Sequence, residues 1–250
     1  MSFDLSIITI TYNDKKGLEY TLESCGELPT SVEYIVVDGN SNDGTKEYLN
    51  SLPEKISWTS EPDTGLYDAM NKGLSRATGE YVLFMNSGDG FYSKNSMATI
   101  LELLQNNKPD VLYGETMYRN EKNKDIGIRS EITTRKLPAE LHWKKLINGM
   151  LVCHQSYIVK RELACQYLTN NLSADIDWMI ETLKKATKIQ NANMLIANYL
   201  VGGVSTQQHR KSLTDRFKVF VKHYGLLKTL NAHVYMVFRH IKLKLFSYTV

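Results

Sequence analysis

Five short apolar runs alternate with longer amphipathic stretches in the first half of the chain. The runs cover residues 5–11, 32–37, 56–59, 81–85 and 111–113. They are continuous and rich in β-branched side chains, which is typical of buried strands in a parallel sheet covered on both faces. The sequence therefore predicts an α/β fold with a mostly parallel central sheet and flanking helices.

The stretches between the runs have helical spacing, and the pattern weakens beyond residue 115. Helices are predicted from about residue 15, from about residue 46, over residues 66–76 and over residues 93–105. The predicted order after that is a charged excursion with short strands (116–135), a helix (139–147), a strand (152–159), a helix (175–185) and a last strand (194–197).

Polar clusters follow three of the predicted strands. Residues 11–13 follow the first, residues 38–45 form a turn rich in Gly and Asn after the second, and residues 86–89 follow the fourth. Ligands of parallel sheets bind outside the carboxyl ends of the strands. These clusters therefore predict a ligand site at one edge of the sheet.

Asp89 is the only acid in the turn over residues 86–89. A carboxylate at the end of a buried strand costs desolvation free energy unless it meets a cation or hydrogen-bond donors. Mg²⁺ and Mn²⁺ prefer such oxygen ligands. Capping of the next helix explains Asp89 equally well, so the metal interpretation depends on its neighbours.

The neighbouring polar residues also allow two interpretations, a ligand site or an ordinary structural role. Asp38 can accept hydrogen bonds from a nucleoside, or it can form a turn. Residues 11–13 can line the same crevice or simply end a strand. Asp68, Asn71 and Lys72 share one helical turn and can face one way, although a solvated helix face also explains them. Their joint occurrence at one sheet edge favours a ligand site.

These segments closely resemble the family 2 glycosyltransferases. The resemblance rests on residues 11–13, 37–45, 63–73 and 83–89, and it is nearest to bacterial exopolysaccharide enzymes of the colanic-acid type. It implies the GT-A fold, which is Rossmann-like. It also implies an inverting transfer of a sugar from a nucleotide-sugar donor, UDP-linked, to a glycan or lipid-linked acceptor.

The resemblance also implies roles for the candidate residues. Thr11, Tyr12 and Asp38 would hold the uracil nucleoside. Asp89 would bind the divalent metal, Mn²⁺ or Mg²⁺, that bridges the diphosphate. The other candidates for the donor site are Asn13, Asp68, Asn71, Lys72, Asn86 and Gly88.

A single displacement needs one general base, which the resemblance places at the start of a helix. Asp175 aligns with that base, and Asp177 lies nearby. A carboxylate there can take the proton of the acceptor hydroxyl as its oxygen attacks the anomeric carbon. In the alternative, Ser173 or Asp175 caps the helix and Asp177 complements its dipole.

The chain departs from the family pattern in two places. Gly88-Asp89 stands where two acids are common, so one ribose or metal contact is missing or is replaced by Asn86. Met70 stands where an arginine is common, so a diphosphate contact must come from elsewhere, with Lys72 as the candidate.

Two features of the second half are weaker candidates. His154 and Gln155, on the predicted strand, can contact the acceptor or the diphosphate, but a lone histidine on an apolar strand is more often structural. Gly203 belongs to a Gly-Gly turn that resembles the late flexible loop of the family, and such a loop can close over a donor. A plain turn competes with that interpretation.

The net charge of +3 conceals a strongly basic tail. From Ser205 onward there are nine Lys or Arg and one acid, Asp215, which leaves −5 for residues 1–204. Apolar positions recur there at helical spacing, and Gly225 divides them into two amphipathic helices. Such helices can lie on an anionic membrane surface, or they can dock on the catalytic domain. Both alternatives stay open.

We expect a GT-A domain over residues 1–204, made of a nucleotide-binding half (1–115) and an acceptor half (116–204), followed by the basic tail (205–250). The chain begins without a secretory signal and contains no apolar run of roughly 20 residues, the length that spans a membrane. Its three cysteines have no pairing or zinc spacing. A cytoplasmic protein, peripheral at the inner face of the membrane if the tail binds lipid, is therefore expected.

Other functions fit the motifs less well. A nucleotidyltransferase predicts a basic Gly-rich loop after the first strand, where this chain has Tyr12-Asn13-Asp14. A dinucleotide-binding oxidoreductase predicts a G-x-G-x-x-G motif there, which is absent. A nucleic-acid-binding protein that uses the tail leaves the acidic crevice unexplained, so no nucleic-acid partner is expected.

Overall fold

The computed structural model describes residues 3–202 and 208–247, and the described strands form one sheet. The strands are β1 (Leu5–Thr11), β2 (Val32–Asp38), β3 (Ile56–Ser60), β4 (Tyr81–Phe84), β5 (Gly90–Phe91), β6 (Val111–Arg119), β7 (Asp125–Ile128), β8 (Tyr157–Lys160) and β9 (Ile189–Leu200). The helices are α1 (Lys15–Cys25), α2 (Thr45–Asn50), α3 (Leu66–Arg76), α4 (Ser96–Asn107), α5 (Arg129–Ile132), α6 (Ala174–Lys185), α8 (His209–Tyr224) and α9 (Leu226–Ser247). Three short 3-10 helices are η1 (Trp143–Asn148), η2 (His154–Ser156) and η3 (Arg161–Leu163).

The sheet runs in the order β3-β2-β1-β4-β8-β6-β9-β5, with β7 paired to β6. Strands β3, β2, β1 and β4 are mutually parallel, and β6 is parallel to β9. Strand β8 is antiparallel to both β4 and β6, so these two blocks point the same way. The prediction of a mostly parallel sheet in an α/β fold is confirmed.

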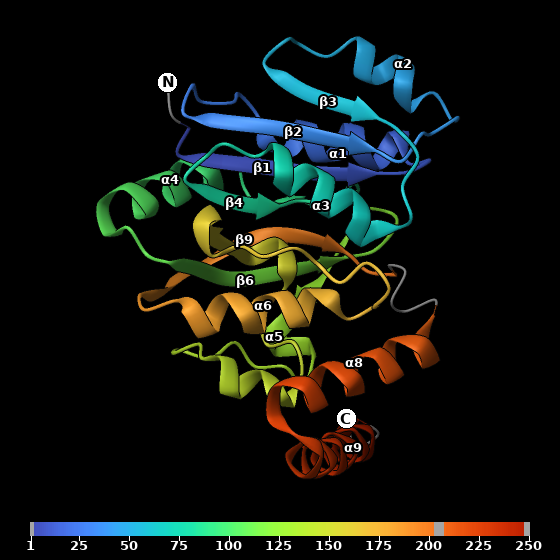
Figure 1. Cartoon of the computed structure of the whole chain (residues 1–250), viewed down its shortest axis with the longest axis vertical. Helices are drawn as coiled ribbons and strands as arrows, with labels where there is room; N and C mark the ends of the chain where they lie inside the picture. The colour runs from blue at the N-terminus through green and yellow to red at the C-terminus, as the bar shows by residue number, and fades with distance from the viewer. Residues whose placement is uncertain (1–2, 203–207, 248–250) are drawn as a thin grey trace.

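Alternate residues of the strands enter two separate cores. Ile8 and Ile10 pack on one face with side chains of α3, α6 and α8, whereas Leu5 and Ile7 pack on the other with α1 and α4. Both faces are therefore covered, which explains the continuous apolar strands. Figure 1 shows α3 and α6 in front of the sheet and α1 behind it.

The parallel register brings the first polar clusters together. Thr11 of β1 stands opposite Asp38 of β2, and the Gly39 amide donates a hydrogen bond to the Thr11 carbonyl at 2.9 Å. Met85 and Ser87 donate backbone hydrogen bonds to β1, so the turn after β4 lies beside the same strand. The expectation that these turns meet at one edge of the sheet is confirmed.

The predicted strand over residues 152–159 is confirmed for residues 157–159, which belong to β8, and is wrong for residues 152–156. His154 and Gln155 lie in η2, because the Ser156 amide bonds back to the Cys153 carbonyl at 3.0 Å and closes a tight turn. Only β8 is extended there. The predicted helix over residues 139–147 is reduced to η1, and the last strand is longer than predicted because polar residues at the start of β9 pair with β6.

Helices α8 and α9 lie at the end of the molecule opposite α2 (Figure 1), and Gly225 separates them as predicted. Val219 and Phe220 of α8 are 1% and 0% exposed within one of the two cores. Helix α9 instead exposes apolar side chains, with Leu227 at 78% and Phe238 at 67%. Within the described residues, no helix combines the length and the apolarity needed to cross a bilayer.

Docking of α8 predicts unequal effects of two substitutions in the tail. Phe220→Ala should lower the free energy of unfolding by roughly 3–5 kcal/mol, because it leaves a cavity in the core. Leu227→Ala removes an exposed side chain and should change that free energy by less than about 0.5 kcal/mol. Urea unfolding followed by circular dichroism measures both. Equal, small effects would contradict the docking of α8.

Candidate functional site

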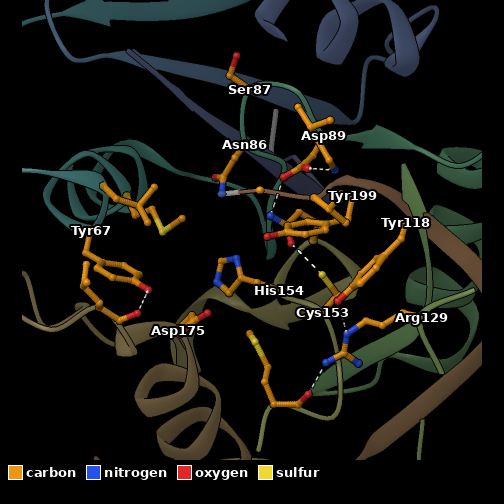
Figure 2. Close-up of a pocket in the computed structure, with 18 of the residues that line it drawn as sticks. Tyr67, Asn86, Ser87, Asp89, Tyr118, Arg129, Cys153, His154, Asp175 and Tyr199 are labelled. Carbon is orange, nitrogen blue, oxygen red and sulfur yellow. Dashed lines mark hydrogen bonds between the residues drawn. The ribbon is translucent and has the colours of Figure 1, made fainter. Parts of the chain in front are cut away.

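A cavity of about 400 Å³ lies where α3, the turn after β4, η2, α6 and the end of β9 meet. Figure 2 shows Asn86 and Asp89 on one side of this cavity, His154 in the middle, and Asp175 and Arg129 on the opposite side. Five of the residues predicted from the sequence line it: Asn86, Asp89, His154, Gln155 and Asp175.

The Asp89 side chain is 4% exposed. Its Oδ2 accepts a hydrogen bond from Gln155 Nε2 at 2.6 Å, and its Oδ1 accepts one from the Leu200 amide at 2.9 Å. Burial raises the pKa of Asp89 to about 8, and the negative charge of Asp14 adds to the increase against these two hydrogen bonds. Asp89 does not cap α4, which begins seven positions later at Ser96, so the capping interpretation is excluded.

The groups around Asp89 suit a hard divalent cation. Asn86 Oδ1 lines the same cavity and is buried without a hydrogen-bond partner. A carboxylate and an amide oxygen are ligands that Mn²⁺ and Mg²⁺ accept, and phosphates commonly complete their coordination. A bound cation would also favour the ionised form of Asp89.

A second group of acidic side chains, together with a histidine, is not among the residues that line the cavity. Among the residues that the structure describes, the one set of three or more His, Cys, Asp or Glu side chains close enough to share an ion is Asp177, Glu181 and His223. Lys222 Nζ lies 2.8 Å from Asp177 and 3.5 Å from Glu181, so an ammonium group already supplies positive charge there.

Asp175 lines the cavity from the first turn of α6. Burial raises the pKa of this carboxyl, while hydrogen bonds from the Ile176 amide and from Tyr67 lower it. Ser173 at the N-cap makes no side-chain capping bond, and Asp175 Oδ1 accepts a hydrogen bond from the Ile176 amide at 2.8 Å. The carboxylate is thus available to a group in the cavity.

Asp177, the second candidate base, is not among the residues that line the cavity. Its Oδ1 is bound by Lys222 Nζ at 2.8 Å and by His223 Nε2 at 2.7 Å, both from α8. Burial alone would raise the pKa of Asp177, but these two partners hold it below its ordinary value. Asp177 therefore attaches α8 to α6, and Asp175 is the carboxylate that faces the cavity.

His154 is a neutral side chain in the cavity wall. It is 5% exposed, its Nε2 bonds to the Tyr167 hydroxyl at 2.8 Å, and its Nδ1 is buried without a partner. Burial lowers the pKa of His154 to about 4. Gln155 beside it holds Asp89, so both residues support the cavity from η2.

The predicted nucleoside residues gather outside this cavity. Asp38 is 0% exposed and accepts hydrogen bonds from the Ser41 amide at 3.0 Å and from Ser60 Oγ at 2.5 Å. Tyr12 is 65% exposed, and the Thr11 hydroxyl is buried without a partner.

The loop after β1 is fastened to the turn after β2. The Asn13 amide donates to Ser41 Oγ at 2.7 Å, and its Oδ1 accepts from the Asn42 amide at 2.9 Å. A Cβ atom at Gly39 would come within 2.5 Å of Asp63 Oδ2 and 3.2 Å of the Tyr12 ring. Only glycine allows these side chains to approach so closely, and the result is a polar cluster with an exposed aromatic ring.

The expectation that Asp68, Asn71 and Lys72 face one way is wrong. Lys72 Nζ bonds to the Pro62 carbonyl at 2.7 Å and lies 3.9 Å from Asp68, because positions four apart share a helix face. Asn71, a quarter-turn away, bonds both backbone groups of Tyr167, at 3.0 and 2.7 Å. None of the three lines the cavity.

Gly88 lies between Leu200, which lines the cavity, and Asp14, which follows β1. Its φ of +88° favours glycine, and a Cβ atom there would lie 3.1 Å from Leu200. Next to it, Ser87 lines the cavity and donates a hydrogen bond to Asp14 Oδ2 at 2.7 Å. Gly203 lies outside the described residues.

Some residues that line the cavity were not predicted from the sequence as site residues. Tyr118, Arg129, Arg135 and Tyr199 all line the cavity. Arg129 is 3% exposed, yet it belongs to a segment that the charge pattern assigned to a surface excursion. No local pattern distinguishes this arginine from the solvated lysines around it, since its burial depends on the distant residues 150 and 151.

The sequence model of glycosyl transferase family 2 matches residues 6–167. This is more than half of the chain, and the chain belongs to that family. The protein is therefore a glycosyltransferase with the GT-A fold.

Individual relatives are more distant. An uncharacterised glycosyltransferase of Mycobacterium tuberculosis is 39% identical over 108 residues, which are 42% of this chain and 41% of that protein. The chain thus spans less than half the length of this relative. A crystal structure of S. aureus TarS with UDP-GlcNAc has a TM-score of 0.66 at 17% identity and covers 97% of this chain and 73% of the other. Glucosyl-3-phosphoglycerate synthase of Mycobacterium tuberculosis, in complex with Mn²⁺ and UDP, has a TM-score of 0.59 at 18% identity, covering 87% and 80%.

The depressed pKa of His154 predicts a pH-dependent loss of stability. The unfolded chain takes up this proton near pH 6.5, whereas the folded protein resists it down to about pH 4. Folding stability should therefore fall as the pH falls through this window, by up to about 3 kcal/mol. Urea unfolding of wild type and His154→Gln between pH 4 and pH 7 measures this contribution.

The substitution Tyr167→Phe is the matched control. It removes the hydrogen-bond partner of His154 but leaves the imidazole buried, so the pH-dependent loss should persist. If the stability of His154→Gln and of wild type changed in parallel over the whole range, the buried histidine would not be the cause.

Proposed function

We propose that the protein is an inverting glycosyltransferase that moves a sugar from a UDP-sugar to a hydroxyl of a glycan or lipid-linked acceptor. The observation that carries this proposal is that Asp89 and Asp175, both with raised pKa, line one cavity from opposite sides. One acid suits the donor diphosphate and the other suits the acceptor hydroxyl. Each is positioned by an element of its own, the turn after β4 and the first turn of α6.

The polar cluster after β1 and β2 is the proposed nucleoside site. Tyr12 offers an exposed ring for stacking, and the buried Asp38 fixes the turn through Ser41 and Ser60. The UDP-containing complexes of the two structural neighbours support a uridine donor. Thr11 and Asn13 position this cluster through their backbone groups, at 2.9 Å to Gly39 and 2.7 Å to Ser41.

Asp89 and Asn86 would hold a divalent cation, Mn²⁺ or Mg²⁺. When bound, this ion would neutralise charge on the diphosphate leaving group. Gln155 and the Leu200 amide keep the Asp89 carboxylate in place, and they also connect it to η2 and β9. Neutral His154 borders the cavity between the two acids and can form a hydrogen bond to a sugar hydroxyl without adding charge.

Asp175 is the proposed general base. The acceptor oxygen forms a bond to the anomeric carbon while the bond from that carbon to the β-phosphate oxygen breaks. The acceptor proton moves to Asp175, and the nucleoside diphosphate departs. A single displacement of this kind inverts the anomeric configuration, and burial that raises the pKa of Asp175 makes it a better proton acceptor.

Activity measurements separate Asp175 from Asp177. Asp175→Asn should lower kcat roughly 10²- to 10⁴-fold, because it removes the proton acceptor while changing few atoms. Asp177→Asn, the matched control on the same helix, should stay within about tenfold of wild type at a temperature where circular dichroism shows it folded. UDP release, measured with Mn²⁺ or Mg²⁺ over a panel of UDP-sugars, provides the assay. Equal kcat values for Asp175→Asn and wild type would contradict the proposal.

The tail supports an acceptor held at a membrane, as in exopolysaccharide synthesis. Helix α9 exposes Leu227, Val234, Val237 and Phe238, next to basic side chains such as Lys228. Apolar side chains flanked by positive charge suit the surface of an anionic bilayer. In this proposal α8 docks on the domain and α9 meets the lipid.

Vesicle binding tests this role of α9. The protein should sediment with phosphatidylglycerol vesicles and much less with phosphatidylcholine vesicles. Leu227→Asp combined with Phe238→Asp should reduce binding at least about tenfold, since two apolar side chains lose burial. Ile126→Asp, which changes an exposed side chain on β7, is the control. Unchanged sedimentation of the double variant would contradict lipid binding by α9.

A further inference from the structure

Arg129 carries a buried positive charge without a carboxylate partner. It is 3% exposed, and its three hydrogen bonds go to neutral oxygens: the Leu151 carbonyl at 2.7 Å, the Met150 carbonyl, and the Tyr118 hydroxyl at 3.1 Å. Within the described part of the chain, no acid lies within ion-pair distance of it. Burying a charge without a charged partner is unfavourable, because the charge loses its hydration. An anion bound in the cavity that Arg129 lines would offset this loss.

Two more arginines interact electrostatically with Asp175. Arg135 lines the cavity, whereas Arg216 of α8 is not among the lining residues but interacts with both Arg135 and Asp175. Burial and the charge of Arg135 both lower the pKa of Arg216, while Asp175 opposes them. Arg216 Nε is buried without a hydrogen-bond partner. Arg129 and Arg135 thus line the cavity, Arg216 interacts with Asp175, and the acids on this side are Asp175 and the exposed Glu121.

This excess of positive charge lies across the cavity from the proposed donor diphosphate. Figure 2 shows Arg129 and Asp175 on one side, and Asn86 and Asp89 on the other, with His154 between them. Arg135 and Arg216 both interact electrostatically with Asp175, so a group held by them would lie on the side of the base. Guanidinium groups match the geometry of phosphate oxygens and bind them with two parallel hydrogen bonds.

We propose that Arg129, Arg135 and Arg216 form a subsite for a phosphate group of the acceptor, close to the hydroxyl that Asp175 deprotonates. The acceptor is then an anionic, phosphate-bearing molecule and not a neutral glycan. This inference rests on the proposed function, because Asp175 defines the acceptor side. The same chemistry is offered by the diphosphate of the donor, and the test below separates the two sources.

Inorganic phosphate is the probe, and calorimetric titration at constant ionic strength is the measurement. Phosphate should bind both the free protein and the protein saturated with UDP and Mg²⁺, with Kd values within about twofold. Arg216→Gln and Arg135→Gln should each weaken phosphate binding roughly fivefold or more, since each removes a charge-assisted contact, and should leave the Kd of UDP unchanged.

Arg210→Gln is the matched control, because Arg210 lies exposed on the same helix as Arg216. Arg129→Gln serves as a third variant if circular dichroism shows it folded, since Arg129 also holds two backbone carbonyls. Equal weakening by Arg210→Gln, or no phosphate binding to the free protein, would overturn the subsite.

Competition separates the two sources of phosphate. If UDP displaces phosphate and the arginine variants weaken both ligands equally, the arginines hold the donor diphosphate and the acceptor assignment is overturned. If UDP does not bind while arginine-dependent phosphate binding persists, the anion subsite is supported and the proposed donor is contradicted.

Discussion

The burial of the Asp89 carboxylate is the constraint on which the rest of the site depends. A carboxylate at the end of a buried strand must be stabilised by donors or by a cation. Gln155 and the Leu200 amide supply the donors from segments 66 and 111 residues away. The turn after β4, η2 and the end of β9 are thereby held at one point, which is the wall of the cavity.

The opposite wall is organised by a second set of charges. Asp175 faces the cavity, while Asp177 in the same helical turn bonds to Lys222 and His223 of α8. The basic tail thus contributes to the position of the proposed base. It also contributes Arg216, which interacts electrostatically with Asp175, and its Val219 and Phe220 belong to the core.

The sequence predicts the elements whose stability depends on their own pattern. The bounds of α3 are as predicted, and the turns after β1, β2 and β4 meet because continuous apolar strands imply parallel pairing. The direction of the Asn71 side chain could not be predicted in this way, because it is set by a hydrogen bond to the backbone of Tyr167, 96 residues away. Such long-range hydrogen bonds leave no periodic signal.

The same limit explains the errors around η2 and β9. Residues 152–159 are apolar enough for a strand, but a local backbone hydrogen bond turns the chain at Cys153. Gln190 and Asn191 are polar and half-exposed, yet they extend β9 because they pair with Leu112 and Tyr113 of β6. The burial of Arg129 likewise depends on hydrogen bonds to the carbonyls of residues 150 and 151. The sequence around residue 129 contains no pattern that predicts these bonds.

The most direct test of the central role of Asp89 is a crystal structure with UDP and Mn²⁺, with data collected at the manganese absorption edge. The account predicts an anomalous peak about 2.0–2.3 Å from an Asp89 carboxylate oxygen, next to the UDP diphosphate, with the uracil beside Tyr12. A peak only at Asp177, Glu181 and His223, or UDP bound without metal near Asp89, would contradict it.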